Sequence, residues 1–264
     1  MASSIVFLMY HELEVPGRRL CQDEPGYVRY VVHSSAFETQ MQWLHRISCR
    51  GVSVSQALEF PDRPCVALTF DDGSETDLVT AAPILDGLAF TATFYITTGF
   101  LGKRGYLSRQ QLRELSDAGF EIGCHSMTHP YLSDLSEGDL NREMLEPRKR
   151  LEDIVGKPVE HFSCPGGRYN RKVQLIAQRG GYRTLSTSRV WPNSLDTDLF
   201  QLGRVVIMRD SRLSDFQRIC RKQGLWRLRT TDAIRSGIKK VIGNLAYDAI
   251  RALLLRAYNG SSPS

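Results

Sequence analysis

Short strand-like runs alternate along this chain with longer segments in which apolar residues recur every three or four positions. The runs lie at residues 5–10, 66–70, 92–96, 120–123, 161–164, 181–186 and 205–208. Runs of this length that are rich in apolar and β-branched residues are typical of buried strands. We therefore expect a strand at each of these places.

The longer periodic segments between the runs predict helices. They cover residues 35–47, 81–88, 108–118, 136–155 and 171–179. We expect Ser34 or Ser35 to cap the first of them, Ser108 with Gln111 to form a capping box, and Gly156 to end the long fourth helix. Strands that alternate with helices indicate a parallel α/β architecture, in which functional sites gather at the carboxyl ends of the strands.

Length and composition suit one large globular domain. The chain has 264 residues, of which 42% are apolar and 24% charged. No stretch approaches the roughly 20 apolar residues of a membrane span, and we interpret residues 5–10 as the first strand and not as a signal peptide. Six cysteines without Cys-x-x-Cys spacing favour reduced, buried thiols and a cytoplasmic protein.

Two adjacent acids, Asp71 and Asp72, stand where the second strand should end, and Gly73 follows them. Neighbouring side chains of a strand point to opposite faces, but a turn at the strand end can bring both carboxylates to the mouth of a site. Like charges that lie close together destabilise each other unless a cation or a shared proton relieves them. The pair therefore indicates a metal site.

A second segment, His125-Ser126-Met127-Thr128-His129, offers nitrogen ligands to such a metal. Two histidines four residues apart lie on one helical face or converge from a strand-to-loop bend, and both arrangements remain open here. Two histidines and one carboxylate leave a coordination position for water, which is the hydrolytic form of a zinc site. The remaining carboxylate is then free to act as a base.

With these two segments the chain resembles the polysaccharide deacetylase family, also called NodB-homology carbohydrate esterases, over about residues 5–208. The resemblance implies that Asp71 is the general base and that Asp72, His125 and His129 bind a divalent metal. We expect zinc, with cobalt, nickel or manganese as alternatives. The resemblance also implies a distorted (β/α) barrel of about seven strands and hydrolysis of an N-acetyl group on a sugar.

The family's third motif is usually Arg-x-Pro-Tyr, and this chain departs from it. Ser163 stands at the arginine position and Gly166 at the tyrosine position. Glycine keeps the backbone N–H that would stabilise an oxyanion, so we expect Gly166 to do so. Arg168 is near enough in sequence to take the place of the missing arginine beside the base.

The family's last motif carries a histidine that acts as the general acid, but no histidine follows His161 in this chain. His11, at the end of the first strand, resembles the histidine of an N-terminal Met-Tyr-His segment in one subgroup of the family. The resemblance implies that His11 protonates the leaving amine. Trp191 is a candidate for the sugar pocket, because a flat ring suits a sugar face.

The remaining residues, 209–264, form a basic extension with 12 Lys/Arg and 4 Asp/Glu, although the whole chain carries a net charge of only +5. Residues 234–258 predict one or two amphipathic helices whose basic face could contact an anionic membrane, at the inner membrane surface in a cytoplasmic protein. Packing of this helix on the barrel is the alternative. No motif indicates nucleic acid binding.

The sequence therefore predicts a metal-dependent hydrolase that removes N-acetyl groups from an amino sugar in a polysaccharide or lipid-linked glycan. Two alternatives remain open. One is an amidohydrolase that acts on a small non-sugar amide. The other is a non-catalytic, metal-stabilised component of polysaccharide assembly, although a structural site has little use for the second acid, Asp71.

Overall fold

A parallel sheet, rolled into a partly open barrel, forms the centre of the protein. The computed structural model describes residues 4–59, 63–226 and 228–230. Seven strands follow one another in the order β10-β9-β8-β7-β6-β2-β12, and an eighth, β5, also pairs with β6. The distorted (β/α) barrel expected from the sequence is confirmed.

The strands are short except for one. The bounds are β2 Phe7–Tyr10, β5 Arg50–Val52, β6 Cys65–Asp72, β7 Thr93–Ile96, β8 Glu121–Cys124, β9 His161–Ser163, β10 Thr184–Ser186 and β12 Val205–Val206. All pairs among them are parallel. Seven of the eight residues of β6 are buried, which explains its continuous apolar run.

Residues 202–206 bring the two ends of the sheet together. Leu202 forms a parallel bridge with Ser186 of β10, and the N–H of Thr187 donates to the carbonyl of Leu202 at 2.8 Å. A few residues later, Val205 pairs with Leu8 of β2. This segment therefore lies beside both β10 and β2, and it carries Arg204 between them.

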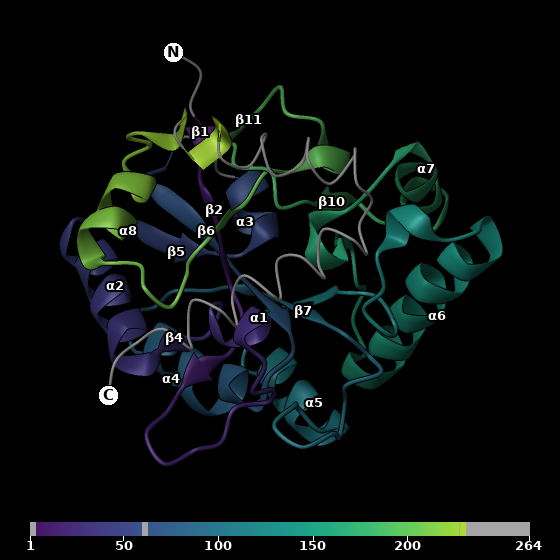
Figure 1. Cartoon of the computed structure of the whole chain (residues 1–264), viewed down its shortest axis with the longest axis horizontal. Helices are drawn as coiled ribbons and strands as arrows, with labels where there is room; N and C mark the ends of the chain where they lie inside the picture. Colours follow the sequence, from purple (N-terminus) through teal and green to yellow (C-terminus); the bar gives the residue numbers. More distant parts are fainter. Residues whose placement is uncertain (1–3, 60–62, 227, 231–264) are drawn as a thin grey trace.

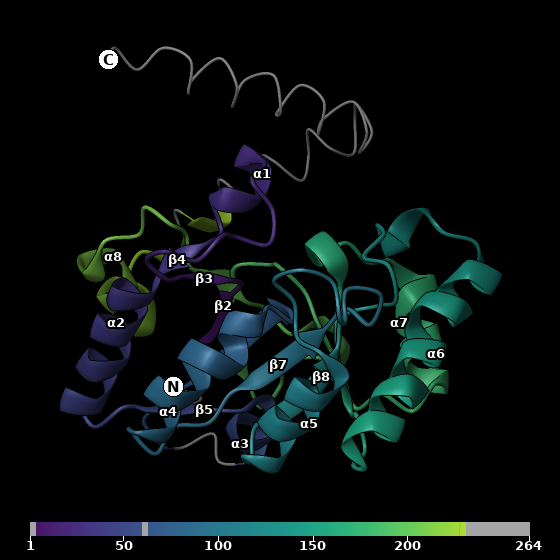
Figure 2. The ribbon, with the colours of Figure 1, turned by 90° about the horizontal axis from the view of Figure 1, so that it is seen from below.

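The larger helices cover the outside of the strands (Figures 1 and 2). Their bounds are α2 Ser34–Arg46, α3 Val54–Glu59, α4 Ala82–Asp86, α5 Arg109–Asp117, α6 Glu137–Val155, α7 Arg171–Arg179 and α8 Leu213–Cys220. Short elements complete the chain: α1 Pro25–Val28, the π-helix η1 Asp77–Ala81, and the 3-10 turns η2 Leu132–Asp134, η3 Pro165–Gly167 and η4 Leu199–Gln201. Two small strand pairs lie apart from the main sheet, β1 Ser4–Ile5 with β11 Asn193–Ser194 and β3 Leu13–Glu14 with β4 Val32–His33.

Most of the predicted helix ends are found. Ser108 and Gln111 form the capping box of α5, and Gly156 ends α6 in the left-handed conformation. The expected cap of α2 was wrong: the helix begins at Ser34, and His33 is the N-cap without a side-chain hydrogen bond. The serines lie inside the first turn instead.

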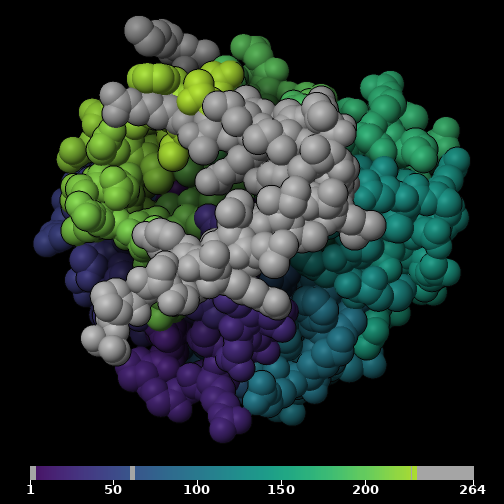
Figure 3. Space-filling model, in the orientation of Figure 1, coloured from purple at the N-terminus to yellow at the C-terminus, as the bar shows by residue number. Residues whose placement is uncertain are grey.

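The hydrophobic core continues beyond residue 208, where we expected the barrel to end. Helix α8 packs on α2, and Phe216 is fully buried with its ring 5.9 Å from that of Trp43. Figure 3 shows this C-terminal part, in yellow-green, at the surface beside the dark blue of α2. The division at residue 208 stays a prediction, and the basic segment at residues 234–258 lies outside the described residues.

The six cysteines are free thiols, and Cys124 and Cys164 are fully buried in the core. Within the described ranges, the chain has no helix that combines the length and the apolar character needed to cross a membrane.

Candidate functional site

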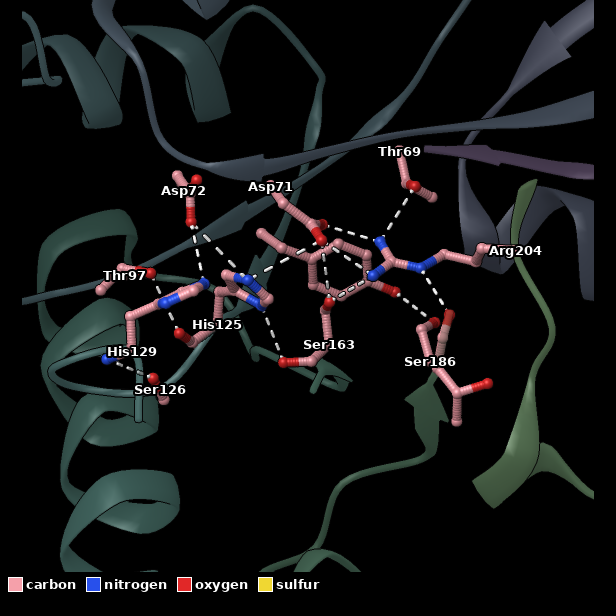
Figure 4. A network of polar contacts seen from close by, with 12 residues as sticks. Thr69, Asp71, Asp72, Thr97, His125, Ser126, His129, Ser163, Ser186 and Arg204 are labelled. Atoms are coloured by element: carbon pink, nitrogen blue, oxygen red, sulfur yellow. Dashed lines mark hydrogen bonds and ion pairs between the residues drawn. The ribbon is translucent and has the colours of Figure 1, made fainter. Parts of the chain in front are cut away.

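Strand β6 ends in a turn, and this turn points the carboxylates of Asp71 and Asp72 in different directions. Asp72 has a φ of 80° and Gly73 a φ of 82°, so the backbone turns sharply after Asp71. Positive φ in a residue other than glycine is costly and is found mainly where a surrounding structure imposes it. Both carboxylates are buried, and in Figure 4 Asp72 faces the two histidines while Asp71 also faces Arg204.

His125 and His129 converge from a strand-to-loop bend and not from a helix. His125 follows the last residue of β8, and the loop after it turns through Ser126 at φ 69° and His129 at φ 66°. Oδ1 of Asp72 lies 3.7 Å from Nε2 of His125 and 3.5 Å from Nε2 of His129. Asp72, His125 and His129 thus offer three ligand atoms that all lie within 4.8 Å of one another.

The geometry of these three atoms fits a tetrahedral divalent metal. Two ligands about 2.1 Å from such an ion lie about 3.4 Å apart, close to the separations found here. Oδ1 of Asp72 is buried and finds no hydrogen-bond partner among the described residues, which is costly unless a cation meets it. Nδ1 of His125 is 2.8 Å from the carbonyl oxygen of Ser163, to which it can donate, and Nε2 is then the ligand atom.

The protonation state of His125 agrees with a role as ligand. Burial lowers the pKa of His125 to about 4, although the charge of Asp71 acts in the opposite direction. The imidazole is therefore neutral at neutral pH, as a metal ligand must be.

Asp71 is bound by an arginine from a distant part of the chain. Nη1 and Nη2 of Arg204 donate to the two carboxylate oxygens of Asp71 at 2.7 and 2.8 Å. Nη2 also donates to Oγ of Ser163 at 2.7 Å, and Ser163 in turn contacts Asp71 at 3.3 Å. Burial alone would raise the pKa of Asp71, but the charge and the hydrogen bonds of Arg204 outweigh burial and hold that pKa well below its usual value. Asp71 is thus an ionised carboxylate in the protein interior.

The expectation that Arg168 stands beside the base was wrong. Asp71 pairs with Arg204, whereas the guanidinium of Arg168 lies 3.8 Å from the ring centroid of Tyr131. In the sequence, Arg204 stands directly before the apolar run at residues 205–208. A charge that is buried at such a position needs a partner.

His11 follows β2 and lies at the same end of the barrel. Its ring is 5.1 Å from the ring of Tyr30. Its Nδ1 is buried and has no hydrogen-bond partner within the part of the chain that the structure describes. Burial lowers the pKa of His11, while the charges of Asp72 and Asp71 oppose that effect. His11 is therefore near enough to the two carboxylates for their charges to act on its pKa, and its role as proton donor stays a prediction.

The other two expected site residues lie on loops. Gly166 is exposed with a φ of 59°, and a Cβ at this position would come within 3.1 Å of the ring of Tyr131. Trp191 is 45% exposed, and the guanidinium of Arg229 lies 3.8 Å from its ring. Their contacts with an oxyanion or a sugar stay predictions.

Sequence reasoning also missed Asp77, in the π-helix that follows the two acids. Asp77 is fully buried, and neither carboxyl oxygen has a hydrogen-bond partner in the described part of the protein. Burial raises the pKa of Asp77 well above its usual value, and the charges of Asp72 and Glu12 add to the effect. The raised pKa favours the uncharged carboxyl, which would add no further negative charge beside the site.

The fold and the site together define a partly open parallel barrel with a candidate Asp-His-His metal centre and a second, ionised acid beside it. The sequence profile of the family described as polysaccharide deacetylase matches residues 60–185. Residues 60–185 of the chain thus resemble the polysaccharide deacetylase family.

Two curated relatives and one solved structure illustrate the similarity. The chain is 34% identical to a peptidoglycan-N-acetylglucosamine deacetylase of Bacillus cereus, over 48% of this chain and 61% of the relative. It is 31% identical to a chitooligosaccharide deacetylase of Sinorhizobium fredii, over 45% of this chain and 54% of the relative. The structure of the Streptococcus pyogenes deacetylase PplD in complex with acetate superposes with a TM-score of 0.72 at 25% identity, over 83% of this chain and 99% of that one. The chain thus spans less than two thirds of either curated relative.

Proposed function

We propose that the protein is a metal-dependent hydrolase that removes N-acetyl groups from an amino sugar in a polysaccharide or lipid-linked glycan. The observation that carries this proposal is that the two adjacent acids, Asp71 and Asp72, have different partners. Asp72 belongs to the three-residue ligand set, whereas Asp71 is held ionised by Arg204 and remains available as a base. The names of the relatives and the acetate bound to the PplD structure support the substrate class.

Asp72, His125 and His129 would hold the metal, which we propose to be zinc, with cobalt, nickel or manganese as substitutes. Bound there, the metal would polarise the acetamide carbonyl and make a water molecule more acidic. Asp71 lies with Oδ2 3.7 Å from Nε2 of His125, next to the ligand set. It can therefore accept the proton of the attacking water, while Arg204 keeps the carboxylate oriented.

Residues that follow two other strands, β9 and β2, would meet the developing negative charge and supply the remaining proton. The N–H of Gly166 would donate to the oxyanion that develops on the carbonyl oxygen. His11 would donate a proton to the departing amine, so that acetate and a free amino sugar leave. Trp191 would contact the sugar at the edge of the site.

An acetate-release assay with controlled metal content tests the proposal. The purified protein is treated with a chelator, reloaded separately with zinc, cobalt, nickel or manganese, and incubated with N-acetylglucosamine oligomers, peptidoglycan fragments or small N-acetyl amides. We expect metal-dependent acetate release from the sugar substrates. Release from small amides alone would favour the amidohydrolase alternative, and tight metal binding without release from any amide would favour the non-catalytic one.

We also propose a cytoplasmic location with peripheral contact between the basic C-terminal segment and the inner membrane surface. The proposal rests on the local excess of positive charge in residues 209–264. Sedimentation of the full chain with vesicles that contain anionic lipid tests it. Equal binding to neutral vesicles, or no binding to either, would contradict it.

A further inference from the structure

The loop that carries the two histidines has a backbone that needs outside support. Ser126 and His129 both have positive φ values, 69° and 66°, although neither is glycine. Such conformations cost roughly 1–3 kcal/mol each and persist only where the surroundings hold them. The direction in which His129 points depends on these turns.

One buried side chain holds the middle of this loop. Glu143 of α6 is only 6% exposed. Its Oε2 accepts hydrogen bonds from the N–H groups of Met127 and Thr128 at 3.0 and 2.8 Å, and its Oε1 accepts one from Oγ1 of Thr128 at 2.7 Å. No ion pair of Glu143 occurs among the described residues, so the loop itself satisfies its carboxylate.

The loop is held from the opposite side by the segment after β7. The N–H groups of Thr98 and Gly99 donate to the carbonyls of Ser126 and Met127 at 3.2 and 2.8 Å. The approach is so close that a Cβ at Gly99 would lie 2.5 Å from the carbonyl oxygen of Met127. The peptide units between the two histidines are therefore fixed both from α6 and from the β7 side.

We propose that Glu143 is a positioning residue, which orients His125 and His129 for the metal through its three hydrogen bonds to Met127 and Thr128. It does not touch the ligand atoms. Because the loop backbone must keep its positive φ values to aim His129 at Asp72, the loss of these bonds lets the loop relax and weakens the metal site. This inference rests on the proposed metal centre, but it is tested by metal binding and not by hydrolysis.

Two conservative variants test whether the length of the Glu143 side chain or its charge matters for metal binding. In Glu143→Gln the amide oxygen can accept both N–H groups, and the amide nitrogen can donate to Oγ1 of Thr128, since a hydroxyl is also an acceptor. Glu143→Asp keeps the charge, but its carboxylate is withdrawn by one C–C bond, about 1.5 Å, and cannot reach all three donors. Glu146 is an exposed glutamate on the same helix, so Glu146→Gln and Glu146→Asp are matched controls.

The dissociation constant for zinc, measured by competition with a chromophoric chelator, decides the question. We expect Glu143→Asp to weaken zinc binding by about 10–100-fold, as is typical when a residue that supports a metal ligand is lost. Glu143→Gln and both Glu146 variants should stay close to the wild type. The visible spectrum of the cobalt-loaded protein should change for Glu143→Asp only.

The thermal midpoint of the metal-free protein separates this role from a general effect on stability. If Glu143→Asp lowers the midpoint but binds zinc and cobalt like the wild type, the positioning role is overturned. Weaker binding in Glu143→Gln than in Glu143→Asp would overturn the hydrogen-bond explanation, because charge would then be the property that matters. If no variant binds metal and neither does the wild type, the proposed metal centre itself fails.

Discussion

Arg204 donates two hydrogen bonds, of 2.7 and 2.8 Å, to the carboxylate of Asp71, although the two residues are 133 positions apart in the sequence. Both side chains are almost fully buried, 0% and 3% exposed. In the third motif of the family that the chain resembles, an arginine is expected where this chain has Ser163. The hydroxyl of Ser163 accepts a hydrogen bond from Arg204. Ser163 and Arg204 together therefore occupy the position beside Asp71 that was expected for the arginine of the third motif.

The first prediction concerns the stability of this pair. Removal of one partner leaves an uncompensated buried charge, so Asp71→Asn and Arg204→Met should each lower the free energy of unfolding by about 3–5 kcal/mol. The double variant should lose clearly less than the sum of the two, because neither charge then remains. Urea denaturation of the four proteins measures the coupling. Additive losses would show that the two side chains do not depend on each other.

The second prediction separates the two adjacent acids. Asp71→Asn should lower acetate release by at least about 100-fold, the lower end of the usual contribution of a general base, with metal content unchanged. Asp72→Asn is the matched control and should lose metal as well as activity. Metal analysis beside the acetate assay distinguishes the two outcomes. Full activity in Asp71→Asn would refute its assignment as the base.

The third prediction concerns His11 as proton donor. His11→Ala should slow hydrolysis of an N-acetyl amide without loss of metal, because an amine leaves poorly unless it is protonated. An activated aryl acetate has a leaving group that needs no proton, so the same variant should hydrolyse it at a rate much nearer to that of the wild type. Equal effects on both substrates, or no effect on either, would give the acid role to another residue.

The fourth prediction concerns stability at low pH and the amino end of β8. Burial by itself would raise the pKa of Glu121. His161 opposes burial through its hydrogen bond and its charge, and Ser55 and Thr93 add further hydrogen bonds. Together these contacts lower the pKa of Glu121 to about 2. A carboxyl whose pKa is lower in the folded state stabilises the protein above its unfolded pKa, near 4.5, and loses that contribution as the pH falls toward 2.

Glu121→Gln should therefore be less stable than the wild type at pH 7, and the difference should shrink between pH 4.5 and pH 2. Denaturant unfolding over this pH range measures it. Glu160, whose side chain is 46% exposed, provides the control: Glu160→Gln should show a small difference that changes little with pH. A gap between Glu121→Gln and the wild type that stays constant with pH would contradict the prediction.

Local sequence patterns predicted most of the longer helices and strands. The continuous apolar run before Asp71 predicted β6, and Ser108 with Gln111 predicted the start of α5, because strand burial and helix capping depend on neighbouring residues. The shortest strands were harder to place. Strand β10 was expected over residues 181–186 but covers only Thr184–Ser186, since pairing with β9 and not local propensity sets its length.

The sequence by itself identified the candidate ligands and the candidate base, because Asp71, Asp72, His125 and His129 lie in two short segments at the ends of strands. Only the tertiary structure decided what surrounds them. Arg204 reaches Asp71 because residues 202–206 lie beside both β10 and β2, and Glu143 reaches the histidine loop because α6 packs beside β8. Contacts of this kind join residues that are far apart in the sequence, so chain folding and not local spacing determines which arginine or glutamate supports the site.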